Sequence, residues 1–230
     1  MNRARIIPFL LVALATALLA TSVACGGSED EAAAASPTEA ATAAPTLPPT
    51  PAATATPFKG GVARFKYPRF NIDAPVDAMA TNAEGQLDTP SKGKENTTVA
   101  WYDQTLDSKY RVGDRPGWGG NAIFSAHVYY ISEKACPSNP RSCPAPFQKL
   151  AQANVGDDIS VVMENGTEYK YKVIKKDQYH RDNVPMGDIV NGAGKPAGKE
   201  WITMITCGGS LDSTGLEYTS RDVVIAERVS

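Results

Sequence analysis

The sequence predicts a mainly β fold, either a barrel or a sandwich with antiparallel or mixed strands. Short runs of β-branched and aromatic residues recur between turn residues, and no regular alternation of strands with long helices is visible. The clearest element spans residues 159–175, where Asn165-Gly166 is a strong hairpin signal between two such runs. After that turn, apolar and charged residues alternate, as expected for a strand with one buried face.

Five other strands and one short helix are predicted in chain order. The strands are residues 70–76, 97–102, 121–128, 201–207 and 222–227, and the helix is residues 147–153. Glycines and prolines within residues 103–120 predict a long loop. Short strands in this number, without helices between them, are typical of β-barrels and β-sandwiches.

The chain of 230 residues divides into three parts by composition. Residues 1–24 combine early arginines with the apolar span 6–20, which predicts a secretory signal peptide because the span is short for crossing a membrane. Residues 25–59 are rich in Ala, Thr and Pro and predict a disordered linker. Residues 60–230 remain for one domain, of a size that can bury a core.

Cys25 follows the predicted signal peptide directly. The sequence ACGG around it resembles a lipoprotein attachment site, at which the cysteine is acylated and anchors the protein to the membrane. Ser22 stands where such sites usually carry an aliphatic residue, so ordinary cleavage near Ala24 is the alternative. In both cases the sequence predicts an exported domain, and lipidation would hold it at the extracytoplasmic face of the cell membrane.

The composition argues against nucleic-acid binding and against a zinc site. Lys and Arg number 23 and Asp and Glu number 25, with no basic stripe, so nucleic acid is not an expected partner. Two histidines and one spare thiol make no recognisable set of zinc ligands. We therefore expect neither a metal nor another cofactor.

Cys207 is the leading candidate nucleophile. It ends the apolar run of residues 201–207, and two glycines follow it, which leaves the backbone open to an approaching substrate carbonyl. The alternative is a buried core thiol, because free cysteine is among the most buried residue types. Cys136 and Cys143 flank a polar loop and could close a disulfide, which would leave Cys207 unpaired in an exported domain and favours the catalytic interpretation.

His127 and Arg221 are the candidate partners of this thiol. His127 comes at the end of an apolar run, as Cys207 does, and strand ends from distant parts of a barrel can share one rim. An imidazole accepts the proton of a thiol or holds the thiolate in an ion pair. Arg221 opens the last predicted strand, and its guanidinium stays protonated, as an oxyanion partner must.

Alternatives remain open at both positions. His127 can equally be a hydrogen-bonded core histidine, and Arg221 can be a solvent-facing arginine. Arg181 and Arg228 are rival candidates for the role of Arg221. The second histidine, His180, lies in a polar run and is expected to be a solvated loop residue.

Six separated motifs resemble the sortase family. They are FNIDAPV (residues 70–76), LDTP (87–90), VAWY (99–102), NAIFSAH (121–127), ITCGG (205–209) and RDVVIA (221–226). The resemblance covers about residues 64–229, which is nearly the whole predicted domain. The TCGG sequence around Cys207 is most similar to class F.

The resemblance implies a closed eight-stranded β-barrel with short helices and long loops. It also implies that Cys207, His127 and Arg221 share one rim and act as a cysteine transpeptidase on LPXTG-like sorting signals of surface proteins. Cys207 would attack the carbonyl after the motif's Thr, and His127 would protonate the departing amine. The thioacyl enzyme would then pass its acyl group to an amine acceptor of the cell wall or of a protein, while Arg221 holds the oxyanion.

Two other functions remain open. One is a non-catalytic surface lipoprotein that keeps the barrel as a peptide-binding module. The other is a cysteine endopeptidase, which would hydrolyse the thioacyl intermediate instead of transferring it. In each case we expect a monomer.

Overall fold

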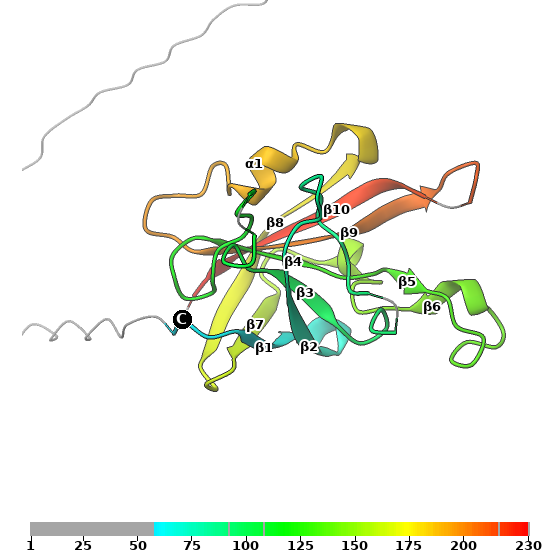
Figure 1. Ribbon diagram of the computed structural model, residues 1–230, viewed down its shortest axis with the longest axis horizontal. Coiled ribbons are helices and arrows are strands. Elements are labelled where there is room, and N and C mark those ends of the chain that lie inside the picture. Colours follow the sequence, from blue (N-terminus) through cyan, green and yellow to red (C-terminus); the bar gives the residue numbers. More distant parts are fainter. Residues whose placement is uncertain (1–57, 92, 108, 216, 230) are drawn as a thin grey trace, which may run out of the picture. The chain divides into compact units, whose positions relative to one another are not determined.

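The structure, a computed structural model, describes residues 58–91, 93–107, 109–215 and 217–229 (Figure 1). Its strands are β1 (Val62–Tyr67), β2 (Ile72–Met79), β3 (Val99–Tyr102), β4 (Asn121–Ser125), β5 (Tyr129–Tyr130), β6 (Cys143–Pro144), β7 (Asp158–Met163), β8 (Glu168–His180), β9 (Trp201–Leu211) and β10 (Tyr218–Arg228). The helical elements are α1 (Met186–Val190) and the 3-10 turns η1 (Pro68–Phe70), η2 (Pro140–Ser142), η3 (Leu150–Gln152) and η4 (Arg181–Asn183). The predicted signal peptide, the linker up to residue 57 and Cys25 lie outside the described residues.

Eight strands form one closed barrel in the order β1-β2-β3-β4-β9-β10-β8-β7. Most neighbours are antiparallel, but β2 pairs with β3, and β4 with β9, in parallel. Strands β5 and β6 form a separate two-stranded sheet. The prediction of a mainly β, closed eight-stranded barrel with short helices and long loops is confirmed, and the sandwich alternative is wrong.

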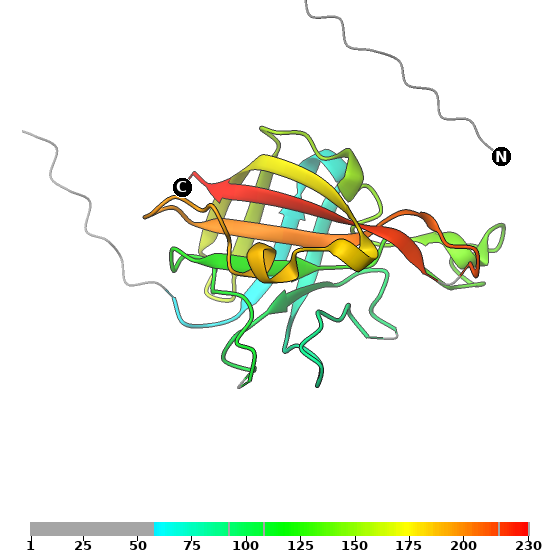
Figure 2. The same cartoon turned by 90° about the horizontal axis from the view of Figure 1, so that it is seen from above.

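Strands β3 and β4 and the stretches 201–206 of β9 and 222–226 of β10 are buried on both faces, which explains why these stretches are mainly apolar. Phe124 and Met204 point into the barrel core. Ile123 and Ile205 belong to a second apolar cluster on the outer face, together with Ile189 of α1. Figure 2 shows α1, in gold, alongside β9 in orange. Because both faces exclude water, the hydrophobic pattern of these strands does not alternate.

Strand β9 continues beyond its predicted end, so Cys207 lies within the strand and not at its last residue. The two glycines after Cys207 have structural reasons of their own. A Cβ at position 208 would lie 2.4 Å from Oδ2 of Asp222, so only glycine fits against that carboxylate. Gly209 has φ +73°, a conformation that favours glycine.

The predicted helix at residues 147–153 is wrong, because only the 3-10 turn η3 forms there. The N–H of Phe147 donates to the carbonyl of His127 (3.1 Å), and the N–H of Ala145 donates to Val128 (3.0 Å). This segment is therefore tied to the chain that follows β4. The α-helix that the described residues do contain, α1, has five residues, too few for a helical period to be visible in the sequence.

The chain enters the barrel near the start of β4. The indole N–H of Trp118 donates to the carbonyl of Phe58 (3.1 Å), and the guanidinium of Arg115 donates to the carbonyl of Lys59 (2.6 Å). Phe58 and Lys59, which the sequence analysis placed in the linker, thus contact the folded domain. Since His127 follows the other end of β4, the linker joins the barrel at the end remote from that histidine.

Glu200 is a buried carboxylate that ties the loop before β4 to β8 and β10. It is 5% exposed and accepts hydrogen bonds from the N–H groups of Gly117 (2.8 Å) and Gly119 (2.9 Å). The hydroxyl of Tyr171 donates to it (2.5 Å), and the guanidinium of Arg228 lies 3.2 Å away. This one carboxylate therefore accepts from three separate segments of the chain.

We expect Glu200→Ala to lower the free energy of unfolding by about 3–5 kcal/mol, because it removes the acceptor of two backbone N–H groups and of the buried Tyr171 hydroxyl. Urea denaturation measures the loss. The matched control is Glu168→Ala, which removes an exposed ion pair with Lys66 (3.4 Å) and should cost less than about 1 kcal/mol. Equal losses in the two variants would contradict this account of Glu200.

Candidate active site

Three neighbouring strands bring His127, Cys207 and Arg221 to one level of the barrel. Cys207 on β9 is the direct register partner of Arg221 on β10. In the parallel pair β4 and β9, Ser125 is opposite Ile205, which places His127 level with Cys207 two residues further along. The hydroxyl of Thr206 donates to the carbonyl of Ala126 (2.7 Å) and extends the contact past the end of β4.

These three residues also lie on the same face of the sheet. Side chains alternate between the faces of a strand, so Cys207 points to the side of Ile205, and Arg221 to the side of Val223. Ile205 and Val223 belong to the outer apolar cluster. The candidate site is therefore on the outside of the barrel, next to the segment that contains α1.

The Cys207 thiol is partly buried, and its environment favours the protonated form. Burial is the largest effect and raises the pKa of the thiol. The positive charge of Arg221 lowers this pKa, whereas the carboxylates of Glu217 and Asp222 raise it, and the net direction is upward. Because the thiolate is the reactive form, Cys207 needs a base to become a nucleophile.

Both ring nitrogens of His127 contact residues 89 and 90. Nε2 lies 3.1 Å from the carbonyl oxygen of Pro90, and Nδ1 lies 3.5 Å from Oγ1 of Thr89. Among the described residues, neither nitrogen is hydrogen-bonded to the thiol of Cys207. The structure thus places the histidine and the cysteine on one face and one level without joining them, as often found in a site without substrate.

The guanidinium of Arg221 is held by its own hairpin. Nη1 donates to the carbonyls of Ser220 (2.9 Å) and Tyr218 (3.2 Å). Nη2 lies 3.9 Å from the carboxylate of Glu217, an exposed side chain. This ion pair is long and open to solvent, so a substrate can displace Glu217 at small cost.

The structure separates the two rival arginines. Arg228 is at the far end of β10, where it faces Glu200, and takes no part in the site. Arg181 lies in η4 and bonds to Asp212 (3.2 Å), with the carboxylate of Glu217 at 4.0 Å. Arg181 is therefore close to Arg221 but is already paired. His180 is the last residue of β8 and not a loop residue, although its side chain is exposed as expected.

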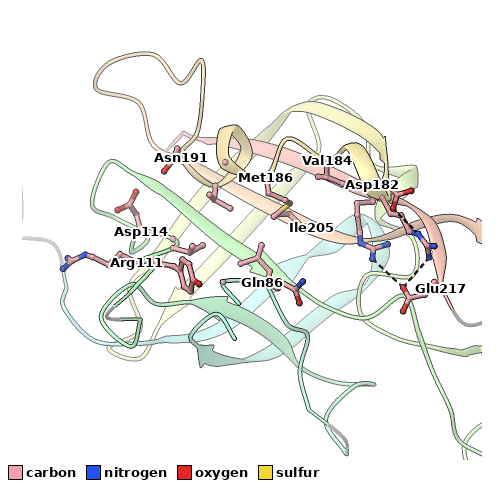
Figure 3. A pocket seen from close by; sticks show the side chains of 18 residues that line it. Gln86, Arg111, Asp114, Asp182, Val184, Met186, Asn191, Ile205 and Glu217 are labelled. Carbon is pink, nitrogen blue, oxygen red and sulfur yellow. Dashed lines mark ion pairs between the residues drawn. The ribbon is translucent and has the colours of Figure 1, made fainter. Parts of the chain in front are cut away.

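A groove of about 950 Å³ runs along the outer face beside the site (Figure 3). Apolar side chains contribute to its lining, among them Leu87, Met186 and Ile205. Arg221 and Glu217 lie at one end, and Figure 3 marks the ion pairs that converge on Glu217 there. The groove has the volume of a site for a short peptide or a small ligand, and its lining combines polar and apolar side chains.

Cys136 and Cys143 are joined by a disulfide, with their Cα atoms 5.6 Å apart. The bond closes the insertion that follows His127, at the two-stranded sheet of β5 and β6. Cys207 is the free cysteine of the described residues.

In the described parts of the chain, no three His, Cys, Asp or Glu side chains gather in a way that could hold a metal ion. No helix in the same residues is long and apolar enough to cross a membrane.

The carboxylate of Glu217 should make the Cys207 thiol less reactive. We expect Glu217→Gln to speed alkylation of Cys207 by iodoacetamide at neutral pH about two- to fivefold, the range of an exposed ion pair. The reason is that this charge raises the pKa of Cys207 and also engages Arg221. Mass spectrometry over a pH series measures the rate. Glu168→Gln, on the remote β7–β8 hairpin, is the control, and an equal change there would contradict the prediction.

A match to a protein family identifies the family to which a chain with this arrangement belongs. Residues 65–229 match the Sortase domain family. The chain belongs to the sortase family. Sortases are cysteine transpeptidases that act on sorting-signal substrates and amine acceptors, and this sortase is an enzyme of that kind. Sortases are generally extracytoplasmic, membrane-associated enzymes.

Solved sortase structures of several classes are similar to this sortase. Sortase A from Corynebacterium diphtheriae, a lid mutant, has a TM-score of 0.49 and 16% identity over 74% of this chain and 70% of its own. Sortase C from Clostridium perfringens SM101 has a TM-score of 0.47 and 18% identity, covering 75% and 72%. Sortase C1 from Streptococcus agalactiae has a TM-score of 0.46 and 22% identity, covering 75% and 69%. No curated protein matches the chain significantly.

Sequence reasoning missed three residues that touch the candidate site of this sortase. Thr89 and Pro90 were noted only as part of the LDTP motif, and their contact with His127 comes from a loop far away in sequence. Glu217 was not considered, although its position four residues before Arg221 could have indicated an ion pair. The assignment to class F stays a prediction.

Proposed function

We propose that Cys207, His127 and Arg221 are the catalytic residues of this sortase. The observation that carries the proposal is their placement at one level, on one face, of three adjacent strands. Cys207 is the free thiol of the described residues, and Arg221 is its register partner. A nucleophile, a base and a fixed positive charge are the groups that acyl transfer requires.

In the proposed reaction, His127 takes the proton of Cys207 while the sulfur attacks the carbonyl that follows Thr in an LPXTG-like signal. The negative charge that develops on the carbonyl oxygen is stabilised by Arg221, whose guanidinium is always protonated. His127 then gives the proton to the departing amine, and a thioacyl enzyme forms. A second amine loses a proton to His127 and takes the acyl group, which frees the thiol.

The groove is the proposed place of the sorting signal. Its apolar side chains, among them Leu87, Met186 and Ile205, suit the Leu and Pro side chains of such a signal. Arg221 also lines the groove. It lies two residues before Val223 along β10 and so points to the same outer face. A peptide that follows the groove towards Arg221 would bring its Thr carbonyl to Cys207, the register partner of that arginine.

We also propose that the mature protein starts at a lipidated Cys25 and is tethered by residues 25–57. The signal-like residues 1–24 and the ACGG sequence support this. The linker leads to Phe58 and Lys59, which contact Trp118 and Arg115 of the barrel. We propose further that this sortase belongs to class F and is a monomer.

Intact-mass analysis of the purified protein with an LPXTG-like peptide, with and without triglycine, tests the function. We expect a thioacyl adduct on Cys207 and, with triglycine, a peptide joined to it. Hydrolysed peptide as the sole product in the presence of triglycine would favour the endopeptidase. No adduct and no cleavage across a panel of signals would overturn the proposed activity.

A further inference from the structure

The contacts of His127 define which of its nitrogens can exchange a proton. Nε2 lies 3.1 Å from the carbonyl oxygen of Pro90, and a carbonyl oxygen accepts hydrogen bonds but cannot donate one. Nε2 must therefore carry hydrogen in the neutral imidazole as well as in the imidazolium. Nδ1 is then the nitrogen that gains and loses a proton in this orientation.

Thr89 suits Nδ1 in both of its protonation states. A hydroxyl can donate to an unprotonated nitrogen and can turn to accept from a protonated one. The distance of 3.5 Å between Oγ1 and Nδ1 is long for a hydrogen bond, so Thr89 occupies Nδ1 only loosely. A thiol or an amine can therefore reach this nitrogen without breaking a strong contact.

Two buried hydroxyls anchor the segment that contacts His127. The carbonyl of Asp88 accepts from Oγ of Ser125 (2.9 Å) and from the hydroxyl of Tyr102, and these two hydroxyls lie 3.0 Å apart. Ser125 is 3% exposed and Tyr102 is 1% exposed. Ser125 lies two residues before His127 on the same face of the chain, so the histidine and its contacts share one anchor.

We propose that Thr89 and Pro90 are positioning residues for His127 and that Ser125 and Tyr102 hold them in place. The Pro90 carbonyl selects the Nε2–H tautomer, as the third group of a nucleophile–base pair orients the base. Nδ1 takes the proton from Sγ as the bond between sulfur and the acyl carbon forms. It returns that proton to the leaving nitrogen as the C–N bond breaks, and Nε2 keeps its own proton throughout.

The chemical step of this inference rests on the proposed function, but the tautomer can be measured without substrate. Nitrogen-15 NMR of histidine-labelled protein distinguishes the two tautomers, and with only two histidines in the chain the variant His180→Gln assigns the signals. We expect neutral His127 to be mainly the Nε2–H form. Ser125→Ala should reduce that fraction. A wild-type protein with mainly the Nδ1–H form, or an unchanged tautomer ratio in Ser125→Ala, would overturn the proposal.

A matched pair of variants tests Thr89. Thr89→Val keeps the shape and removes the hydroxyl, and we expect kcat to fall about 10-fold with little change in KM, a part of what acid–base catalysis contributes. Thr89→Ser keeps the hydroxyl and should retain kcat within about twofold. Equal losses in both variants, or a change in KM alone, would overturn the role of Thr89. If the wild type transfers no acyl group, the proposed function fails while the tautomer measurement still decides the inference.

Discussion

Cys207→Ala should lose acyl transfer by a factor of at least about 10⁴, because the covalent intermediate cannot form without the sulfur. The thioacyl adduct should be absent from intact-mass spectra at every peptide concentration. The free energy of unfolding should change by less than about 1 kcal/mol, because the side chain is only partly buried and alanine fits a strand. Product formation over time and urea denaturation measure the two effects.

Cys207→Ser is the matched control for that variant. It keeps the size of the side chain and replaces the thiol by a hydroxyl, which stays protonated at neutral pH and is a weak nucleophile. We expect it to be nearly as inactive as Cys207→Ala. A residual transfer within about 10-fold of the wild type in either variant would show that another group is the nucleophile.

Arg221→Met should reduce kcat about 10²- to 10³-fold, the usual cost of removing a donor to a developing oxyanion. Arg181→Met should act mainly on KM and by less than about 10-fold, because that guanidinium lines the groove and is paired with Asp212. Steady-state kinetics of transfer separates the two. If Arg181→Met lowers kcat as much as Arg221→Met, the assignment of the oxyanion partner is wrong.

Arg221→Lys refines this test, because it keeps the charge and removes the planar fork of donors. An activity between those of the wild type and Arg221→Met would indicate that both charge and geometry matter. The pKa of Cys207 gives a second readout. Arg221 lowers that pKa, so Arg221→Met should move the onset of thiol alkylation to higher pH, whereas Arg221→Lys should move it less.

The positions of most strands could be predicted from the sequence because each signal is local, whereas the closed barrel was expected from the family resemblance. The run before Cys207 is continuous and rich in β-branched residues, and the run before His127 is short and largely apolar, which is typical of strands buried on both faces. The Asn165-Gly166 turn fixes its hairpin by itself, and the structure has β7 and β8 on either side of it. In these cases a few neighbouring residues contain the whole cause of the structure.

The surroundings of the site could not be predicted, because their causes lie in contacts between distant segments. Nothing near Pro90 in the sequence indicates that its carbonyl will meet His127, 37 residues later. At residues 147–153, where an α-helix was expected, the backbone makes hydrogen bonds of the 3-10 type, from Leu150 to Phe147 and from Ala153 to Leu150, and local propensity does not separate the two. In a closed barrel, the topology brings such distant segments together, and the hydrophobic periodicity of the sequence does not indicate the topology.

The pairing of β4 with β9 also bears on when this sortase can first react. The hydrogen bond between Thr206 and Ala126 joins residues 80 positions apart. The chain must therefore lose the entropy of closing this loop before the hydrogen bonds between β4 and β9 can form. Non-local pairings of this kind make folding slow, while the β7–β8 hairpin can form within microseconds. We therefore expect the strands that bring Cys207 and His127 to one level to pair late in folding, so that the chain is inert towards peptides until its barrel has closed.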